Sequence, residues 1–260
     1  MKTSELHQPE SNAFTIATAL TQIRLATSFL TILPVSIESA SEADVAASMA
    51  WFPLVGFAMG IAFAIEDYAL SFFLGTAVRT AITVLSMAAL SGAIHLDGLA
   101  DTADALGAGR DRVRALEILR DSRIGTYGAV AVLFAVVLKI IALAGASGWP
   151  RVAALVLAPT LSRWSMVAVS YKLKYLRKDG AGSAMFGSGR ERNFTIASVV
   201  AIVAMLPLIS FKIFVAYAVA NGITLLLRSF YSQWLGGVTG DLIGACGEIV
   251  EVFAIVVLAS

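Results

Sequence analysis

An all-α, polytopic membrane protein is the fold class that the sequence predicts. Of its 260 residues, 58% are hydrophobic and only 14% are charged, whereas a soluble domain carries about 25% charged residues. Apolar stretches long enough to cross a bilayer recur along the whole chain. Backbone amides in hydrocarbon must be satisfied within their own segment, so these stretches are expected to be helices. The prediction is a helical bundle with roughly 6–8 membrane segments, in a single domain that spans residues 1–260.

The expected membrane segments coincide with the apolar runs. They are residues 13–35, 46–65, 68–94, 126–145, 151–171, 194–211, 213–227 and 238–259. The first segment carries Arg24, so an interfacial helix is an equal alternative to a full span. The run 68–94 is interrupted by an arginine and is either one long tilted helix or a surface piece followed by a span. Residues 194–227 are expected to form a tight pair of spans that turns at Lys212 or at Asn221-Gly222.

Two loops rich in basic residues predict the orientation in the bilayer. Residues 95–125 contain five arginines and residues 172–192 contain six basic groups, together eleven of the nineteen cations. Cytoplasmic loops carry an excess of Lys and Arg, so both loops are expected on the cytoplasmic side. The short links at Glu66-Asp67 and Gly145–Pro150 carry no cation and are expected on the outside.

The composition also excludes several classes of protein and site. The net charge is +1, which gives no electrostatic bias toward nucleic acid. The single cysteine, Cys246, excludes an intrachain disulfide framework and a cysteine-based zinc cluster. The two histidines, His7 and His95, are too few for an all-histidine metal site. The first dozen residues lack the features of a signal peptide, so no cleavage is expected.

Three aspartates beside an apolar segment are the most informative feature of the chain. Asp97, Asp101 and Asp104 follow one another with no cation before Arg110. On a helix they fall within an arc of roughly 60°. Carboxylates stacked on one face repel one another, and a bound divalent cation removes that penalty. Hard oxygen ligands beside a phosphate site suit Mg²⁺, whereas the alternative interpretation is a solvated acidic helix face.

A second motif follows a short helix that is expected over residues 111–120. It reads Asp121-Ser122-Arg123-Ile124-Gly125 and places an acid, a hydroxyl and a guanidinium directly before a membrane segment. Arginine is the preferred bidentate partner of phosphate oxygens. The motif therefore indicates a role in binding a substrate phosphate, whereas the arginines of 111–120, taken alone, favour a role as positive-inside anchors.

The last membrane segment carries a second group of acids. Asp241 and Glu248 are seven residues apart and lie on nearly one face, with Glu251 at its edge. Charged groups inside a membrane are costly unless paired or water-facing, so a functional role is the first interpretation. Arg163 and Lys139 lie inside other spans, and a structural ion pair with them is the alternative.

The stretch of residues 95–104, His-Leu-Asp-Gly-Leu-Ala-Asp-Thr-Ala-Asp, resembles the cobalamin synthase family, whose members are adenosylcobinamide-GDP ribazoletransferases. The likeness continues through Ala115–Gly125 and Gly236–Ala245, with one departure at Ala105, where the family more often has glycine. The resemblance implies a Mg²⁺-dependent, multi-pass enzyme of the bacterial inner membrane with its active site facing the cytoplasm. It also implies that the hydroxyl of α-ribazole, or of its 5′-phosphate, displaces GMP from adenosylcobinamide-GDP in a late step of cobalamin biosynthesis.

The roles of the candidate site residues are hypotheses within this resemblance. The expected Mg²⁺ ligands are Asp97, Asp101, Asp104, Asp241 and Glu248. The expected substrate-binding residues are Arg120, Asp121, Ser122, Arg123 and Gly125. The expected catalytic group comprises His95, Asp97, Asp101, Asp104 and Arg123. In it Arg123 stabilises charge in the transition state, and His95 is either the general base or an orienting donor.

Other functions stay open at this stage. A CDP-alcohol phosphotransferase performs a similar displacement, but its Asp-Gly-x-x-Ala-Arg motif is not matched, because Asp101 follows Ala100. A divalent-cation transporter is a non-enzymatic alternative, although its acids are expected near mid-membrane rather than beside an arginine-rich loop. The expected partners are the two small-molecule substrates and the lipid bilayer, with a homo-oligomer left open and nucleic acid excluded.

Overall fold

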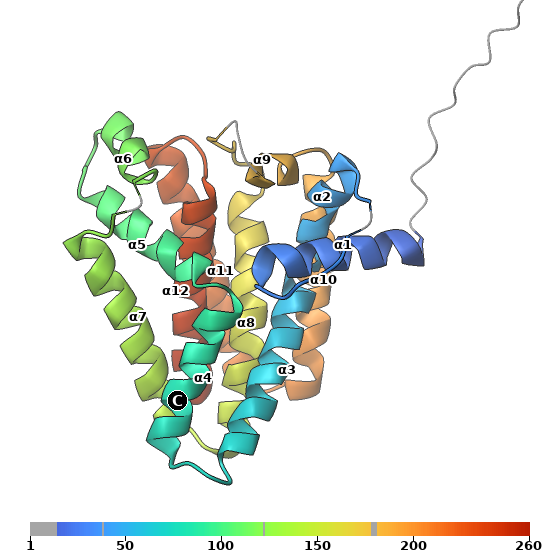
Figure 1. Cartoon of the computed structure of the whole chain (residues 1–260), viewed down its shortest axis with the longest axis vertical. Helices are drawn as coiled ribbons and strands as arrows, with labels where there is room; N and C mark the ends of the chain where they lie inside the picture. Colours follow the sequence, from blue (N-terminus) through green and yellow to red (C-terminus); the bar gives the residue numbers. More distant parts are fainter. Residues whose placement is uncertain (1–14, 38, 122, 178–180) are drawn as a thin grey trace, which may run out of the picture.

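The computed structural model describes residues 15–37, 39–121, 123–177 and 181–260, and within these ranges the chain is a helical bundle (Figure 1). In chain order the elements are α1 (Ile16–Leu30), α2 (Glu42–Ser48), η1 (Met49–Trp51), α3 (Phe52–Leu70), α4 (Thr76–Leu90), α5 (Ile94–Leu106), α6 (Arg112–Ile118), α7 (Thr126–Gly145), α8 (Gly148–Ser170), α9 (Ala181–Met185), α10 (Arg190–Met205), η2 (Leu206–Leu208), α11 (Phe211–Trp234) and α12 (Gly240–Ala259). The described ranges hold no strand, only an isolated bridge between Tyr175 and Val238. The predicted all-α class is confirmed.

Within the described ranges, six helical stretches are long and apolar enough to cross a membrane. They are Glu42–Leu70, Thr126–Gly145, Gly148–Ser170, Arg190–Leu208, Phe211–Trp234 and Gly240–Ala259. Helices α4 and α5 pass the same test only as a pair, and they are bent by 85° where they meet. The count of six, or seven with the bent pair, falls within the predicted range. Helix α1 has only 15 residues and lies across the bundle (Figure 1), as expected for the interfacial alternative.

The run 68–94 is not one long helix, and that alternative is wrong. Helix α3 continues to Leu70, a turn follows, and α4 begins at Thr76. A second break separates α4 from α5, where Gly92 and Ala93 both adopt positive φ, 61° and 56°. These two residues end α4 and turn the chain sharply before α5 begins. Helix α5, which carries the three aspartates, therefore lies against the end of the bundle instead of continuing through it (Figure 1).

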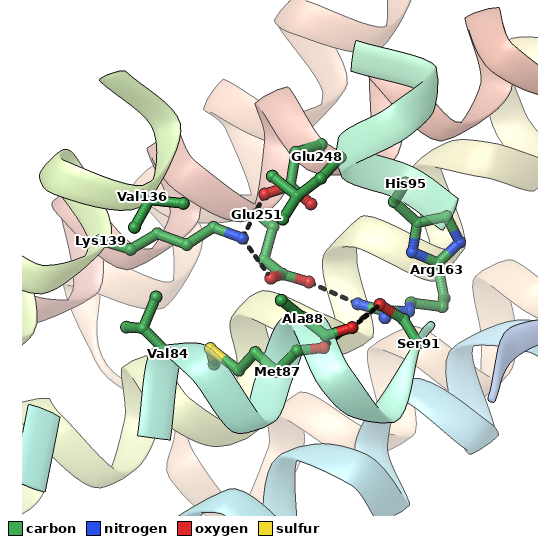
Figure 2. A pocket seen from close by; sticks show the side chains of 11 residues that line it. Val84, Met87, Ala88, Ser91, His95, Val136, Lys139, Arg163, Glu248 and Glu251 are labelled. Atoms are coloured by element: carbon green, nitrogen blue, oxygen red, sulfur yellow. Dashed lines mark hydrogen bonds and ion pairs between the residues drawn. The ribbon is translucent and has the colours of Figure 1, made fainter. Parts of the chain in front are cut away.

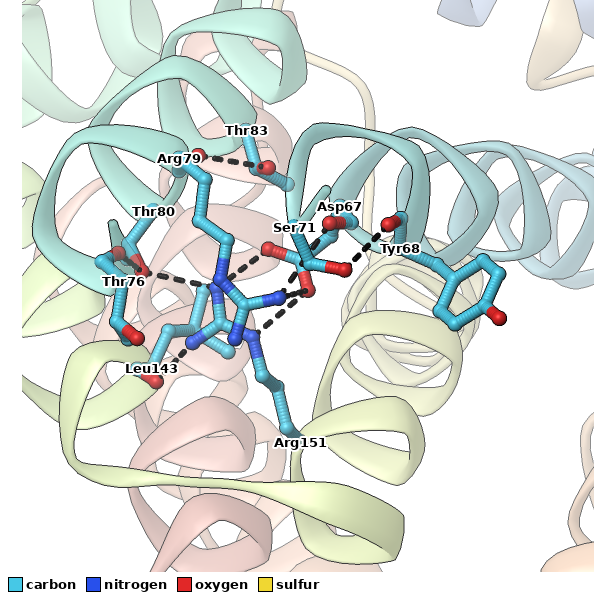
Figure 3. A network of polar contacts seen from close by, with 9 residues as sticks. All are labelled: Asp67, Tyr68, Ser71, Thr76, Arg79, Thr80, Thr83, Leu143 and Arg151. Carbon is cyan, nitrogen blue, oxygen red and sulfur yellow. Dashed lines mark hydrogen bonds and ion pairs between the residues drawn. The ribbon is translucent and has the colours of Figure 1, made fainter. Parts of the chain in front are cut away.

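A buried ion network explains why the expected external link at Glu66-Asp67 is in fact helix (Figure 3). Asp67 accepts hydrogen bonds from Arg151 at 2.5 and 2.8 Å and from Arg79 at 3.2 Å. Asp67 and Arg151 are only 4% and 3% exposed. Because the carboxylate is paired with cations from α4 and α8, it needs no water, and α3 can extend past it. The network joins α3, α4 and α8 at the end of the bundle opposite α6 and α9.

Helix α8 forms the centre of the bundle. Every residue from Ala153 to Ser170 is buried, with α3 on one side and α12 on the other. Glycines at positions 56 and 60 permit the close contact with α3, because a Cβ at Gly60 would lie 2.5 Å from the carbonyl oxygen of Val156. The core therefore depends on backbone-to-backbone packing, which is typical of membrane helices.

The C-terminal helices differ from the predicted pair in one respect. The turn between α10 and α11 lies at residues 206–210, close to the expected Lys212. The alternative turn at Asn221-Gly222 is wrong, because both residues lie inside α11. The amide of Asn221 donates to the carbonyl oxygen of Tyr217 at 2.8 Å, so the helix itself satisfies this polar side chain.

Candidate functional site

Helices α5 and α12 cross in close contact, and this contact joins the two acidic stretches of the chain. A Cβ at Gly98 would lie 2.7 Å from the carbonyl oxygen of Asp241. One turn away, a Cβ at Gly244 would lie 3.4 Å from the Cα of His95. The early aspartates and the start of the last helix therefore meet at one end of the bundle, as the sequence requires for a shared site.

Gly98→Ala is expected to destabilise the protein by about 1–3 kcal/mol, because the added methyl group meets backbone that cannot rotate away. The matched control is Gly222→Ala in α11, where a Cβ would meet nothing within 4 Å. This control should be neutral or stabilising by about 0.5–1 kcal/mol, since alanine is the better helix former. The check is the melting temperature of each detergent-solubilised variant. Equal melting temperatures for the two variants would contradict the close approach of α5 and α12.

Three carboxylates and one guanidinium form what we call the acidic cluster: Asp97, Asp101, Asp241 and Arg177. Asp101 interacts electrostatically with the other three members. Arg177 donates to Oδ2 of Asp241 at 2.5 Å and to the carbonyl oxygen of Leu119 at 2.6 Å. Asp97 is exposed and Asp101 is half-buried, so the cluster opens to solvent. One cation faces three acids, which leaves an excess of negative charge.

A short backbone pairing holds Arg177 in place. The N–H of Leu176 donates to the carbonyl oxygen of Val238 at 2.9 Å, and the N–H of Val238 donates to that of Lys174 at 2.8 Å. Position 237 must be glycine here, because a Cβ would collide with the carbonyl oxygen of Lys174. In the sequence Arg177 is only one of the six basic residues of the 172–192 loop. Its partner Asp241 is 64 residues away, so no local spacing rule identifies the pair.

Asp104 points toward the start of α7. Its two carboxylate oxygens accept the backbone N–H groups of Gly125 and Gly128 at 2.6 and 2.9 Å. These N–H groups belong to the first turn of α7, which lacks intrahelical partners for them. Side chains at either glycine would collide with the carboxylate. Asp104 therefore caps α7 and fixes the loop that carries the second motif.

The second motif lies in an exposed loop between α6 and α7. Arg123 is 86% exposed and pairs with Asp121 at 2.6 Å. Hydrogen bonds from the Arg123 side chain lower the pKa of Asp121. Arg120 is also exposed, whereas Ser122 lies outside the described residues. The loop thus presents the side chains of Arg120 and Arg123 at the surface.

A second group of charges is buried deeper in the bundle (Figure 2). Lys139 of α7 pairs with Glu248 and, at 2.7 Å, with Glu251, and Arg163 of α8 pairs with Glu251. All four side chains are at most 5% exposed. They line a cavity of about 20 Å³ together with His95. These contacts match the alternative interpretation, a structural ion pair with Lys139 and Arg163, and Glu248, an expected Mg²⁺ ligand, is held in that pair.

The five carboxylates expected to hold one metal ion thus occupy three places. Asp97, Asp101 and Asp241 belong to the acidic cluster, Asp104 caps α7, and Glu248 pairs with Lys139 about 10 Å further along α12 by helical rise. Across the described part of the chain, no three His, Cys, Asp or Glu side chains are arranged as a metal centre. The acidic cluster alone has the donor chemistry for a hard divalent cation, because its carboxylates outnumber its cation.

A cavity of about 290 Å³ adjoins the acidic cluster. Its polar lining residues are His95, Tyr175, Arg177 and Asp241, and the rest of the lining is apolar or glycine. Burial raises the pKa of Tyr175, so its hydroxyl stays protonated at neutral pH. The cavity draws on segments from α1 to α12, which is why the sequence did not predict it.

Comparisons with known proteins agree with one another. A model of the family described as cobalamin-5-phosphate synthase matches residues 22–259. A protein of Syntrophobacter fumaroxidans named adenosylcobinamide-GDP ribazoletransferase is 39% identical, over 87% of this chain and 93% of its own length. Proteins with the same name from Desulforamulus reducens and a Roseiflexus species are 34% and 37% identical, over 90% and 88% of this chain and 94% and 86% of their own lengths. No solved structure shows a significant match.

Proposed function

This chain belongs to the cobalamin-5-phosphate synthase family, whose named members are transferases, and from this premise we propose the reaction that it catalyses. The hydroxyl of α-ribazole, or of its 5′-phosphate, attacks the cobinamide-linked phosphorus of adenosylcobinamide-GDP. A new phosphorus–oxygen bond forms, the bond to the bridging oxygen of the diphosphate breaks, and GMP leaves. The alcohol proton passes to a base, and the product is adenosylcobalamin or its 5′-phosphate.

The observation that carries this proposal is the meeting of α5 and α12. Their contact at Gly98 and Asp241 brings both acidic motifs to one end of the bundle. A diphosphate ester reacts slowly with an alcohol unless the charge on its phosphate oxygens is neutralised and the attacking and leaving oxygens are aligned. A carboxylate cluster that is paired with Arg177 is suited to both tasks.

Asp97, Asp101 and Asp241 are not arranged as a preformed metal centre, but their oxygen donors would hold Mg²⁺ together with water and substrate phosphate, the ligands that this ion commonly keeps. When bound, this ion neutralises charge on the diphosphate. Arg177 donates to Asp241 and lines the cavity, and it is the proposed partner of the phosphate oxygens of the substrate. Arg123 and Arg120 approach the same diphosphate from the exposed loop, and Arg123 stabilises charge that develops in the transition state.

His95 is the proposed acceptor of the hydroxyl proton. Its side chain is 8% exposed and lines both the 290 Å³ cavity and the small buried cavity. Within the described part of the chain, His95 is therefore the histidine that lies between the 290 Å³ cavity and the buried ion pairs. The neutral imidazole has one ring nitrogen with a free lone pair, which can accept a proton.

The basic loops support an active site that faces the cytoplasm. The carbonyl of Leu119 in the 95–125 loop accepts a hydrogen bond from Arg177 of the 172–192 loop, so both loops lie at the site end of the bundle. Their excess of cations is typical of the cytoplasmic side. We therefore propose a multi-pass protein of the bacterial inner membrane, with its substrates drawn from the cytoplasm.

GMP formation is the direct test of this function. Purified protein in detergent should release GMP from adenosylcobinamide-GDP only when α-ribazole or its 5′-phosphate is also present. Removing Mg²⁺ with a chelator should abolish the reaction, and adding Mg²⁺ back should restore it, because charge neutralisation by the metal lowers the barrier by several kcal/mol. GMP release without an acceptor alcohol, or no release with both substrates and Mg²⁺, would contradict the proposal.

A further inference from the structure

The cavity beside the acidic cluster has two chemically different ends. At one end Arg177 and Asp241 form their ion pair, with His95 close by on α5. At the other end the lining is hydrophobic and includes Phe29, Leu30, Met49, Phe52, Met166 and Met185. They come from α1, η1, α3, α8 and α9. A ligand that fills this space needs a polar part and a flat or flexible apolar part.

The volume restricts the size of that ligand. Small-molecule sites range from about 300 to 1,000 Å³, and this cavity measures about 290 Å³. It therefore suits one small ligand of nucleoside size. A corrinoid macrocycle is much larger and must stay outside, with only its phosphate end near Arg177.

The hydrophobic end discriminates between the two nucleoside parts of the proposed reaction. Guanine carries an amino group and a carbonyl on its ring edges, and each needs a hydrogen-bond partner when buried. Leaving such a group unsatisfied costs about 1–3 kcal/mol. The benzimidazole base of α-ribazole has no polar group attached to its ring. Methionine side chains adapt to flat rings and make favourable sulfur–aromatic contacts. They accept this base, whose single free ring nitrogen is its one hydrogen-bond acceptor, at a lower cost than guanine with its several polar groups.

Aromatic packing places the α9 segment on one side of the cavity. Tyr175 stacks on Phe186 with ring centroids 4.4 Å apart, and both rings line the cavity with Met185. Tyr175 is also two residues from Arg177. Residues 175–177 therefore reach both ends of the cavity, since Tyr175 packs with the hydrophobic end and Arg177 lies at the charged end.

We propose that this cavity is the binding site of the acceptor nucleoside, with its base among Met49, Phe52 and Met185 and its ribose toward Asp241 and His95. The inference rests on the proposed function and deepens it. It assigns the hydrophobic residues as the determinants of base specificity. The guanosine part and the corrinoid of the other substrate lie outside the cavity.

Replacing Met185 by glutamine tests this assignment, since the two side chains have similar shape. A glutamine amide pairs with the adenine edge and disfavours an apolar base. The preference for α-ribazole over its adenine analogue, measured as the ratio of kcat/KM values, should fall at least about tenfold, or about 1.4 kcal/mol. The KM for adenosylcobinamide-GDP should stay within about twofold of wild type. Met49→Gln, on a different element, should act in the same direction and serves if the first variant does not fold.

Met205→Gln is the matched control, because Met205 and Met185 are both 8% exposed and Met205 does not line the cavity. Calorimetric titration of the purified protein with α-ribazole alone gives a readout without turnover. Tight binding to wild type and to Met205→Gln, weakened about tenfold in Met185→Gln, is the expected result. The inference would be overturned if neither Met185→Gln nor Met49→Gln changed the preference for α-ribazole over its adenine analogue. It would also be overturned if these variants instead raised the KM for adenosylcobinamide-GDP. In either case, GMP release by the wild-type protein would still support the proposed function. No GMP release by wild type would overturn both.

Discussion

Asp101→Asn is expected to slow GMP release roughly a thousandfold. Asp101 interacts with both other carboxylates of the acidic cluster, so its neutralisation removes a charged oxygen ligand from the centre of the proposed metal site. Metal charge stabilisation is worth several kcal/mol, and each 1.36 kcal/mol corresponds to about a tenfold change in rate. The measurement is the initial rate of GMP formation with both substrates saturating, on protein whose melting temperature matches wild type.

Asp111→Asn is the matched control for this variant. Asp111 is exposed, and its carboxylate caps α6 by accepting the N–H of Arg114 at 3.0 Å. Asparagine caps helices about as well as aspartate, so both the rate and the stability should be unchanged. A near-normal rate in Asp101→Asn would remove Asp101 from the catalytic machinery, and the proposed metal site would then need other ligands.

Lys139→Met is expected to have the largest effect on stability, about 3–5 kcal/mol. Lys139 is the ion-pair partner of Glu248, and removing one member of a buried pair leaves an uncompensated charge. For a protein of this size the loss corresponds to a fall in melting temperature of roughly 10 °C or more. The measurement is thermal unfolding of the detergent-solubilised protein.

The double variant Lys139→Met with Glu248→Gln separates charge imbalance from lost packing. It removes one positive and one negative group and leaves Arg163 paired with Glu251. At least half of the lost stability should return. Lys212→Met, at a half-buried position on α11, is the control and should be nearly neutral. A double variant no more stable than the single one would show that packing, not charge, is the cause.

The fold was largely predictable because a bilayer leaves few alternatives. Apolar runs and two basic loops were enough to predict a helical bundle and the end at which these two loops lie. The errors share one physical cause. Asp67 lies within α3 because Arg79 and Arg151 neutralise it, and Asn221 lies within α11 because its amide bonds to the helix. Polar residues were taken as breaks where the structure satisfies them locally or across helices.

The sequence motifs of the candidate site were predictable, but which of their residues lie together in the structure was less so. Helical spacing correctly placed Asp97 and Asp101 on one helix. The pairing of Lys139 with the acids of the last segment was only the alternative to a metal-binding role for Glu248. Spacing alone does not show that Asp104 meets the start of α7, since Gly125 is 21 residues away. Arg177 and the cavity depend on contacts between distant segments, for which a single sequence carries no local pattern.

The buried charges also impose an order on biogenesis. Lys139 precedes its partner Glu248 by 109 residues, and Arg163 precedes Glu251 by 88. At translation speeds of about 5–20 residues per second, the lysine waits roughly 5–20 s for its counter-ion. During that interval α7 and α8 hold cations that hydrocarbon does not tolerate. A chain that stops before α12 therefore keeps Lys139 in α7 and Arg163 in α8 without the carboxylates that neutralise them.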